Sequence, residues 1–599
     1  MRWTELARAT NRSGSTADPP PTQTREPTMT SQSNAAPPPS PSVAPRGASG
    51  GHPKGLSVLF ATEMWERFNF YGMRALLTLF LVNALAFKKD EASIIYGGFL
   101  GLCYLTPMLG GFVADNYLGN RACILLGGLT MAVGQLLLFL SGTLYETQID
   151  LATTCMWIAL GVLILGNGFF KPNISSMVGQ LYPKGDSRLD SAFTIFYMGI
   201  NLGAFLGITI CPILGDVVDT GPDGQQVRVV TAFKWGFLAA GAAMLIGTGV
   251  FFLLMNKHVV DPAGNAVGAK PKSAREAQKG EKAEFSNGAI AGAIAAAVAL
   301  VFVFHFVVEQ NWIYSFIYSS GIALGGLILT DKSLVREERD RILVLYAVAF
   351  FVIFFWACFE QAGSSLTFIA DNQTDRELFG WNMPPSLVQN ANSIFIVVLA
   401  LPFSFIWLTL SRMRIEPISP VKQAFGLATL ALGFYIIAMQ VDGLGETEKI
   451  SVIWLIVMYF FHTVGELCLS PIGLSLVSKL APTRFASLLM GVWFLANAAG
   501  YALAGTLGAV LPATGDQYDA ASKAGIDLRA VLNKTVELTP EIAARLEELK
   551  ISATYPKFAG FTIHNLYEFF MLFVILPGIA AILLFAISPL LKRMMHGVK

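Results

Sequence analysis

From Leu56 onward, long apolar runs alternate with short polar stretches along almost the whole chain. We distinguish fourteen such runs, and an α-helix needs about twenty apolar residues to cross the hydrocarbon core of a bilayer. Six runs lie within 56–255, two within 288–330 and six within 341–591. The pattern therefore predicts an all-α integral membrane protein with fourteen transmembrane helices.

The order six, two, six predicts an internal pseudo-repeat, with two bundles of six helices joined by two linker helices. A polar insertion lies between the last two runs, and its TPEIAARLEELK stretch predicts a short helix. We expect these parts in chain order: a disordered N-terminal tail, 1–55; a first six-helix bundle, 56–255; a linker with two extra transmembrane helices, 256–340; and a second six-helix bundle, 341–599, with an outward-facing insertion at 513–558.

The ends of the chain bear on processing and orientation. Residues 1–55 contain Pro-Pro-Pro twice and lack the apolar core of a signal peptide, which predicts a disordered tail. Met29 is an alternative translation start to Met1. Lys and Arg are concentrated in the short loops on the side of the N-terminus, so we predict that both termini are cytoplasmic.

Composition excludes several other classes of protein. Charged residues make up 14% of the chain, and the 42 Lys and Arg nearly balance the 41 Asp and Glu, so no basic excess is available for nucleic acid. The chain has no Gly-Lys dipeptide, which excludes a Walker A loop. Cysteines and histidines show no metal-binding spacing, and we expect no cofactor. The six cysteines are predicted to be buried apolar side chains rather than disulfides: Cys103, Cys123, Cys155, Cys211, Cys358 and Cys468.

Ionisable side chains at membrane depth are costly unless paired, so each is a functional candidate. Glu63, Glu66 and Arg67 stand at i, i+3 and i+4, on one face of the first predicted helix. Tyr71 and Arg74 continue the same stripe. Two carboxylates beside one guanidinium can hold or release a proton. The alternative is a set of charged groups that reach the membrane surface near the start of the helix.

Three further charges lie deep in later runs. Lys171, followed by helix-bending Pro172, lies in the fourth run, and Glu360 and Glu466 lie midway along runs of the second half. The interior then holds two cations, Arg67 and Lys171, against four acids, so we expect at least one carboxylate to be protonated in some state. A structural ion pair is the alternative for Lys171. His462, also in a run, is predicted to be a packed residue.

A tight loop after the second run contains Gly111, Asp115, Gly119 and Arg121 in GGFVADNYLGNR. A simple turn needs the glycines but not the acid and the base. We therefore predict a conformational latch between neighbouring helices in which Asp115 and Arg121 take part.

These residues carry a family resemblance. The Gly111–Arg121 loop resembles the inner-loop motif of the major facilitator superfamily, and EMWERFNFYG resembles the ExxERFxYYG motif of its proton-coupled oligopeptide transporters. GNGFFKPNISS, GDSRLDSAFTIFYMGINLGA and GELCLSPIGLSLVSKLAP resemble further motifs of that family, in the family's order. The resemblance implies the major facilitator fold, with twelve core transmembrane helices in two six-helix bundles. The two linker helices resemble those of bacterial members, which implies a bacterial inner membrane.

The resemblance also implies roles for individual residues. Arg67 and Lys171 would bind the carboxylate of a peptide, coupled to Glu63 and Glu66 in an ion-pair network. Glu360 would be a main site of proton coupling. Glu466 would pair with the amino group of the peptide, and Arg74 and Asp371 would form an outer gate pair. The positions that would contact the rest of the peptide are Tyr71, Tyr104, Asn201 and Asn392. A zwitterionic peptide needs just such a set, with a cation at one end, an anion at the other and amide partners between.

Two departures from the family pattern bear on this expectation. Phe70 replaces the first tyrosine of the family's pair, so one hydroxyl is missing beside Tyr71. No histidine occurs between Tyr96 and Asp115, where some relatives use one for proton coupling. Coupling in this chain would therefore fall on carboxylates.

The sequence thus predicts a symporter, not an enzyme, that imports di- and tripeptides with protons across a lipid bilayer. One alternative is a family member that carries nitrate or another small anion, although Glu466 would then have no amine to pair with. Another is a membrane receptor or scaffold that uses 513–558 for recognition, which leaves the buried charges unexplained. The oligomeric state stays open.

Overall fold

The computed structural model describes residues 51–183, 186, 188–220, 226–270 and 285–598. Within them, thirteen helices are long and apolar enough to cross a membrane. The thirty-residue α1 (Lys54–Asn83) carries too many charges to meet that criterion, yet most of its side chains are buried. With α1 counted, the predicted fourteen spans are present. Of the predicted tail at 1–55, residues 1–50 lie outside the described residues, and α1 already begins at Lys54.

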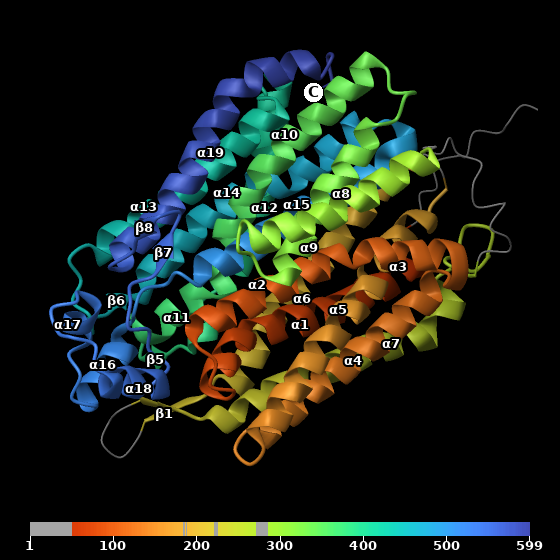
Figure 1. Cartoon of the computed structure of the whole chain (residues 1–599). Helices are drawn as coiled ribbons and strands as arrows, with labels where there is room; N and C mark the ends of the chain where they lie inside the picture. The colour runs from red at the N-terminus through yellow and green to blue at the C-terminus, as the bar shows by residue number, and fades with distance from the viewer. Residues whose placement is uncertain (1–50, 184–185, 187, 221–225, 271–284, 599) are drawn as a thin grey trace, which may run out of the picture. The chain divides into compact units, whose positions relative to one another are not determined.

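The first half of the helices packs around α1 and α4, and we call it the N-half (Figure 1). Aromatic rings fill its core; for example, Phe80 and Phe237 meet edge to face with centroids 5.0 Å apart. A π-helical turn, Ala114–Leu118, ends the second span. Besides α1, the N-half contains α2 (Lys89–Leu105), α3 (Pro107–Val113), α4 (Asn120–Leu144), α5 (Ile149–Gln180), α6 (Leu189–Gly215) and α7 (Phe233–His258).

The C-half has its own core, in which α13 packs on α14 and α19. One span is interrupted at Glu360–Gly363, where a 3₁₀ turn joins α10 to α11. The C-half contains α10 (Arg336–Phe359), α11 (Ser365–Asn372), α12 (Asn390–Arg412), α13 (Ser419–Val441), α14 (Val452–Leu480), α15 (Ala486–Gly508) and α19 (Leu566–Met594).

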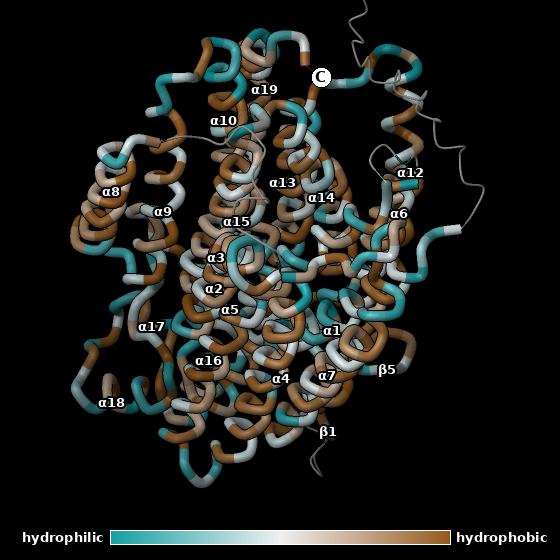
Figure 2. Tube along the Cα trace, turned by 90° about the vertical axis from the view of Figure 1, so that its right-hand side faces the viewer, coloured by the Kyte–Doolittle hydropathy of each residue, from teal (hydrophilic) through white to brown (hydrophobic). Residues whose placement is uncertain are grey.

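Two linker helices, α8 (Asn287–Phe306) and α9 (Trp312–Leu329), lie at one flank of the helical array (Figure 2). None of the residues of α8 is buried, although the helix is strongly apolar, as expected of a helix surrounded by lipid. The first turns of α9 pack on α2 and α15, where the Tyr314 hydroxyl donates to the Ile94 carbonyl at 2.9 Å.

The insertion forms three short helices around a small apolar core that includes Leu528, Leu532 and Leu546. Thr539 caps the helix predicted in TPEIAARLEELK by accepting a hydrogen bond from Ile542 N at 3.3 Å. The helices are α16 (Gly515–Lys523), α17 (Leu528–Leu532) and α18 (Pro540–Glu548). Short strand pairs lie between spans: β1 (Val218–Thr220) with β2 (Gln226–Arg228), β3 (Thr374–Asp375) with β6 (Ile450–Ser451), β4 (Glu377–Leu378) with β5 (Trp381–Asn382), and β7 (Lys557–Phe558) with β8 (Phe561–Thr562).

Chain direction defines the two ends of the helical array. We call the end where α1 finishes at Asn83 and α15 at Gly508 the insertion side, because 513–558 follows there. The opposite end, where α1 begins and α19 finishes at Met594, is the terminus side. Figure 1 shows α16, α17 and α18 far from the marked C-terminus.

Candidate functional site

The predicted acid–base stripe on α1 forms a buried ion-pair cluster. The Arg67 Nε lies 3.0 Å from Glu63 Oε1 and 2.5 Å from Glu66 Oε2, and all three side chains are at most 4% exposed. Asn167 of α5 donates to the second oxygen of Glu66 at 3.4 Å. Helical spacing places both acids beside one guanidinium, so the cluster is formed within a single helix.

Lys171 lies on α5 with its ammonium 3.6 Å from the centroid of the Tyr104 ring, a close cation–π contact. In the part of the chain that the structure describes, no carboxylate forms an ion pair with it. The structural ion pair considered as the alternative is therefore not seen. Pro172 follows inside the helix, as the sequence indicated.

Glu360 lies at the break between α10 and α11 and reaches the N-half. Its Oε2 is 3.0 Å from Arg74 Nη1 and accepts a longer hydrogen bond, 3.4 Å, from the Tyr96 hydroxyl. The Arg74 guanidinium also lies 4.8 Å above the Tyr71 ring. The prediction that Arg74 pairs with Asp371 is therefore wrong in this structure, because Arg74 forms its ion pair with Glu360 instead.

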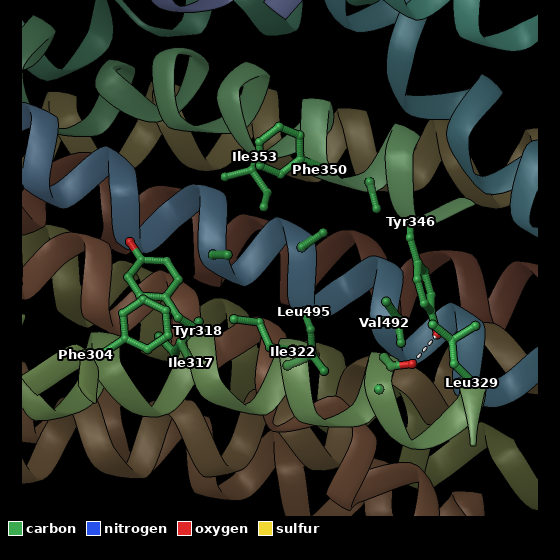
Figure 3. Close-up of a pocket in the computed structure, with 16 residues that line it drawn as sticks. Phe304, Ile317, Tyr318, Ile322, Leu329, Tyr346, Phe350, Ile353, Val492 and Leu495 are labelled. Carbon is green, nitrogen blue, oxygen red and sulfur yellow. Dashed lines mark hydrogen bonds between the residues drawn. The ribbon is translucent and has the colours of Figure 1, made fainter. Parts of the chain in front are cut away.

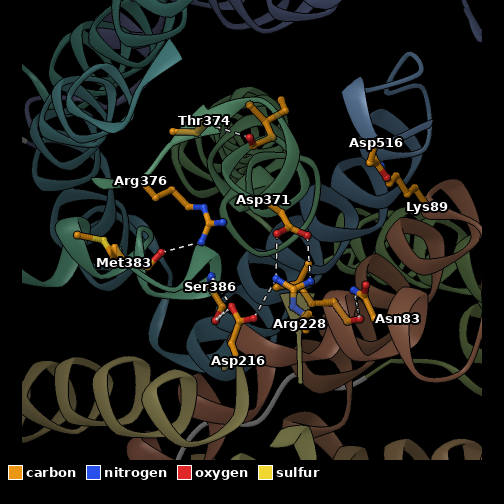
Figure 4. Close-up of polar contacts among 12 residues, drawn as sticks. Asn83, Lys89, Asp216, Arg228, Asp371, Thr374, Arg376, Met383, Ser386 and Asp516 are labelled. Atoms are coloured by element: carbon orange, nitrogen blue, oxygen red, sulfur yellow. Dashed lines mark hydrogen bonds and ion pairs between the residues drawn. The ribbon is translucent and has the colours of Figure 1, made fainter. Parts of the chain in front are cut away.

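Asp371 instead belongs to a second network on the insertion side. Arg228, at the end of β2, forms two hydrogen bonds of 2.9 Å with Asp371 and lies 3.0 Å from Asp216 (Figure 4). Ser386 donates to Asp216 through its amide, at 3.0 Å, and its hydroxyl, at 2.7 Å. Burial works against the charge of Arg228, but the two carboxylates raise its pKa above the ordinary value.

Sequence reasoning missed Arg228 and Asp216. Asp216 follows the fifth apolar run directly and is fully buried, so an acid at that boundary was an available signal. Arg228 stands in a polar loop, where a single arginine gives no signal of its own.

A central cavity of about 190 Å³ lies where the two halves meet. It brings together seven of the predicted residues: Tyr71, Arg74, Tyr104, Asn201, Glu360, Asn392 and Glu466. The α1 cluster and Lys171 do not line the cavity, although Lys171 lies against Tyr104, which does. Lining residues that the sequence did not single out include Tyr197, Gln389, Ser393, Tyr459, Ser470 and Tyr501.

Glu466 of α14 forms the acidic part of the wall contributed by the C-half. Asn392 of α12 donates to its Oε2 at 3.0 Å and to the Thr463 hydroxyl at the same distance. Asn201, in contrast, donates to the Tyr197 carbonyl of its own helix. His462, one turn before Glu466, is fully buried with its ring 4.5 Å from that of Phe434, which agrees with a packed residue.

In the inner-loop motif, Arg121 rather than Asp115 makes the contacts between neighbouring helices that the structure records. Arg121 donates to the carbonyls of Met255, Val259 and Val267 and to Asn256 Oδ1, which ties α4 to the end of α7. No ion pair between Asp115 and Arg121 is present among the described residues. Gly119 adopts φ 79°, and a Cβ there would lie 2.8 Å from Ala269, so the glycine is required.

All six cysteines are buried and free. In the described ranges, no three His, Cys, Asp or Glu side chains are grouped to hold a metal ion.

These features define a polytopic membrane protein whose two helical halves enclose a charged cavity, the arrangement of a secondary transporter. Comparison with known proteins identifies the family: the POT family model matches residues 121–518, and the chain belongs to this family. The family is one of transporters and not of enzymes.

Relatives and solved structures cover most of the chain. It is 34% identical to peptide transporter YePEPT of Yersinia enterocolitica, over 78% of this chain and 89% of the relative. A di-/tripeptide transporter of Lactococcus lactis is 32% identical, with 76% and 88% covered. The crystal structure of a POT family transporter in complex with 5-aminolevulinic acid superimposes with a TM-score of 0.67 at 27% identity, covering 92% of this chain and 98% of that one. The predicted major facilitator fold is thereby confirmed.

Proposed function

We propose that this chain imports di- and tripeptides together with protons, by alternating access of the cavity between its halves. One observation carries the proposal. The cavity is lined by the Glu466 carboxylate of the C-half and by Tyr104 of the N-half, whose ring carries the Lys171 ammonium. An acid and a cation on opposing halves suit the two ends of a zwitterionic peptide. The names of the peptide-transporting relatives point to the same substrates.

The Lys171 ammonium is available to bind the carboxylate end of a peptide. Its ammonium contacts an aromatic face and no acid among the described residues, whereas Arg67 is held by two carboxylates. We infer that Lys171 meets the substrate first and that Arg67 follows when Glu63 or Glu66 takes up a proton. At the other end Glu466, oriented by Asn392, receives the amino group, and Asn201 and Tyr71 contact the peptide between.

Glu360 is our main candidate for proton coupling. It contacts Arg74 and Tyr96 across the boundary between the halves, so its charge helps to hold them together. Protonation would weaken the ion pair with Arg74 and release that contact. The movement of the halves would then depend on the proton.

We also propose that the protein lies in a bacterial inner membrane with both termini cytoplasmic, so that the insertion faces outward. The parts predicted from the sequence, 1–55, 56–255, 256–340 and 341–599, would then act as a tail, two moving bundles and the linker between them. The charge bias of the short loops supports this orientation.

The proposal is tested with purified protein in liposomes and an imposed pH gradient, inside alkaline. We expect uptake of labelled dipeptide to depend on the gradient, and to be competed by tripeptide but not by nitrate. Competition by nitrate would favour the anion-carrying alternative. If labelled dipeptide does not enter the liposomes at all, peptide transport is contradicted.

Glu360→Gln tests the coupling. It is expected to abolish gradient-driven uptake while exchange of internal for external dipeptide continues, because the substrate contacts remain. Glu146→Gln, at an exposed loop acid, is the matched control and should leave both activities unchanged. If gradient-driven uptake survives in Glu360→Gln, coupling lies elsewhere.

A further inference from the structure

An apolar groove of about 470 Å³ separates part of the linker helix α9 from the C-half (Figure 3). Its walls are α9, α10 and α15, with Phe304 of α8 at one end. The groove is distinct from the central cavity, since the two share no lining residue.

The groove exists because α9 leaves its neighbours partway along its length. Its first turns pack tightly, with Tyr314 and Ile317 against α15. Beyond them, three glycines of α9 line the groove without side chains. A Cβ at Gly321 or Gly325 would lie 3.6 Å from Leu495 or Tyr346, whereas a Cβ at Gly326 would meet nothing within 4 Å. Tyr346 of α10 bridges the gap by donating to the Gly325 carbonyl at 2.8 Å (Figure 3).

The lining chemistry excludes water as the occupant. Sixteen residues form the walls, and the tyrosine hydroxyls of Tyr318 and Tyr346 are their only polar side-chain groups. A buried water needs two to four polar partners, and one of these hydroxyls is already bonded to a carbonyl. An apolar molecule is therefore required, and at membrane depth the molecules available are lipids.

The dimensions fit one acyl chain. The lining runs along α9 from Ile317 to Leu329, which is about 18 Å at 1.5 Å per residue. One leaflet contributes about half of the ~30 Å hydrocarbon core. The groove thus spans the depth of the leaflet on the terminus side, where α9 ends.

A polar cavity begins where the groove ends. Leu329 belongs to the groove, and Thr330, Asp331, Lys332 and Ser333 line the adjoining cavity together with Ser286 at the start of α8. Lys332 is exposed and supplies a positive charge at the depth of the lipid headgroups. A phosphate there would meet the Lys332 ammonium and the hydroxyl of Ser286, which accepts from Ala289 N and keeps its own proton to donate. The hydroxyls of Thr330 and Ser333 already donate to the Leu327 carbonyl and to Asp331, whose carboxylate lies in the same cavity and opposes a phosphate.

We propose that this groove and the adjoining cavity form a binding site for one phospholipid of the terminus-side leaflet. An acyl chain fills the space between α9, α10 and α15, and the phosphate lies at Lys332. Such a lipid completes the packing of the linker helices on the C-half, which protein side chains leave unfinished. The site is independent of the proposed transport function.

The test measures lipid that stays bound. Protein purified in detergent is analysed by native mass spectrometry, and about one phospholipid per chain is expected. Gly326→Phe places a ring in the groove and should abolish that bound mass. Gly292→Phe is the control, because Gly292 on α8 also has nothing within 4 Å of its Cβ but does not line the groove.

A second measurement adds phosphatidylglycerol back to delipidated protein and follows the unfolding temperature. The temperature should rise in the native chain and in Gly292→Phe, but not in Gly326→Phe. Lys332→Gln should bind phosphatidylglycerol about fivefold more weakly, because it loses one charge near the phosphate. Equal lipid retention in both phenylalanine variants, or a detergent tail as the sole bound mass, would overturn the site.

Discussion

The two sides of the protein differ in how the N-half meets the C-half. On the insertion side, polar contacts join them: Arg228 with Asp371, and Ser93 with the Ser364 hydroxyl at 2.9 Å. Thr78 donates to the Gly363 carbonyl at the same distance. These contacts are buried or nearly so, and they come from loops and helix ends on both halves.

Helices α6 and α12, one from each half, are joined near the insertion side and are more exposed toward the terminus side. They touch near the insertion side, where Asn390 donates to the Thr209 hydroxyl at 2.7 Å. Further along, Met198 of α6 is 59% exposed, and Leu401 of α12 is 79% exposed. The hydrogen bonds from Asn390 to the Phe205 carbonyl and to Thr209 thus join the two helices at their insertion-side ends.

This difference indicates which contacts would break in the alternating access proposed above. The structure is closed toward the insertion side, so a transporter that alternates must release those contacts in its opposite state. Contacts that served only to stabilise one arrangement of the two halves could be apolar and permanent. Here the junction depends on ion pairs and hydroxyls, which can be exchanged for water when the halves move apart.

The largest effect is expected from Arg228→Met. Asp216 is fully buried, and without Arg228 both it and Asp371 lose their cation. Removing one member of a buried ion pair lowers the free energy of unfolding by about 3–5 kcal/mol. Thermal unfolding of the purified protein measures the change.

A triple variant separates charge from packing at this network. Arg228→Met combined with Asp216→Asn and Asp371→Asn removes the charge of all three side chains, so most of the lost stability should return. The part that stays lost is the attraction of the two acids for buried Arg376. The insertion side should nevertheless open more readily, which a Ser93→Cys reporter and a membrane-impermeant thiol reagent would detect. If the triple variant is as unstable as Arg228→Met alone, unpaired charge is not the cause.

A smaller effect is expected where α2 and α15 approach closely on the same side. A Cβ at Gly505 would lie 2.0 Å from the Tyr314 hydroxyl and 2.9 Å from the Ser93 carbonyl. Gly505→Ala should therefore lower the free energy of unfolding by about 1–3 kcal/mol through overpacking. Gly249→Ala, where nothing lies within 4 Å, should be neutral or slightly stabilising. Equal stability of the two variants would show that α15 can shift without cost.

The contrast between local and distant signals explains what the sequence could predict. The α1 cluster was predictable because Glu63, Glu66 and Arg67 share a face through helical spacing alone. The partner of Arg74 was not, because Glu360 reaches it only through a break between α10 and α11. The spans followed from hydropathy, whereas the cavity residues Tyr459 and Tyr501 look like ordinary aromatic residues of apolar helices until the halves are assembled.

The smallest effects belong to the ties between the insertion and α2. Lys89 donates to both oxygens of Asp516 at 2.8 Å, and Lys88 lies 2.8 Å from Glu547 Oε2 (Figure 4 shows the first pair). Asp516→Asn should increase the rate of deuterium uptake in α16 about fivefold or less, since such pairs contribute about 0.2–1 kcal/mol. Glu547→Gln should change α18 still less, because its side chain is 65% exposed.

The pH dependence of these ties has a definite sign. Burial opposes the charge of Asp516, but Lys89 lowers the pKa of that carboxyl below its ordinary value of 3.8. A hydrogen bond from Lys88 likewise lowers the pKa of Glu547 below 4.5. A carboxyl group whose pKa is lowered in the folded protein stabilises the fold at pH values above its ordinary pKa. This stabilisation is lost as the pH falls through the lowered pKa. Deuterium uptake of the insertion, corrected for intrinsic exchange, should therefore be constant between about pH 5 and 8. Glu537→Gln, at an exposed acid that precedes α18, is the control and should leave α18 unchanged. Loosening of the insertion near neutral pH would mean that groups other than these two carboxyls hold it against α2.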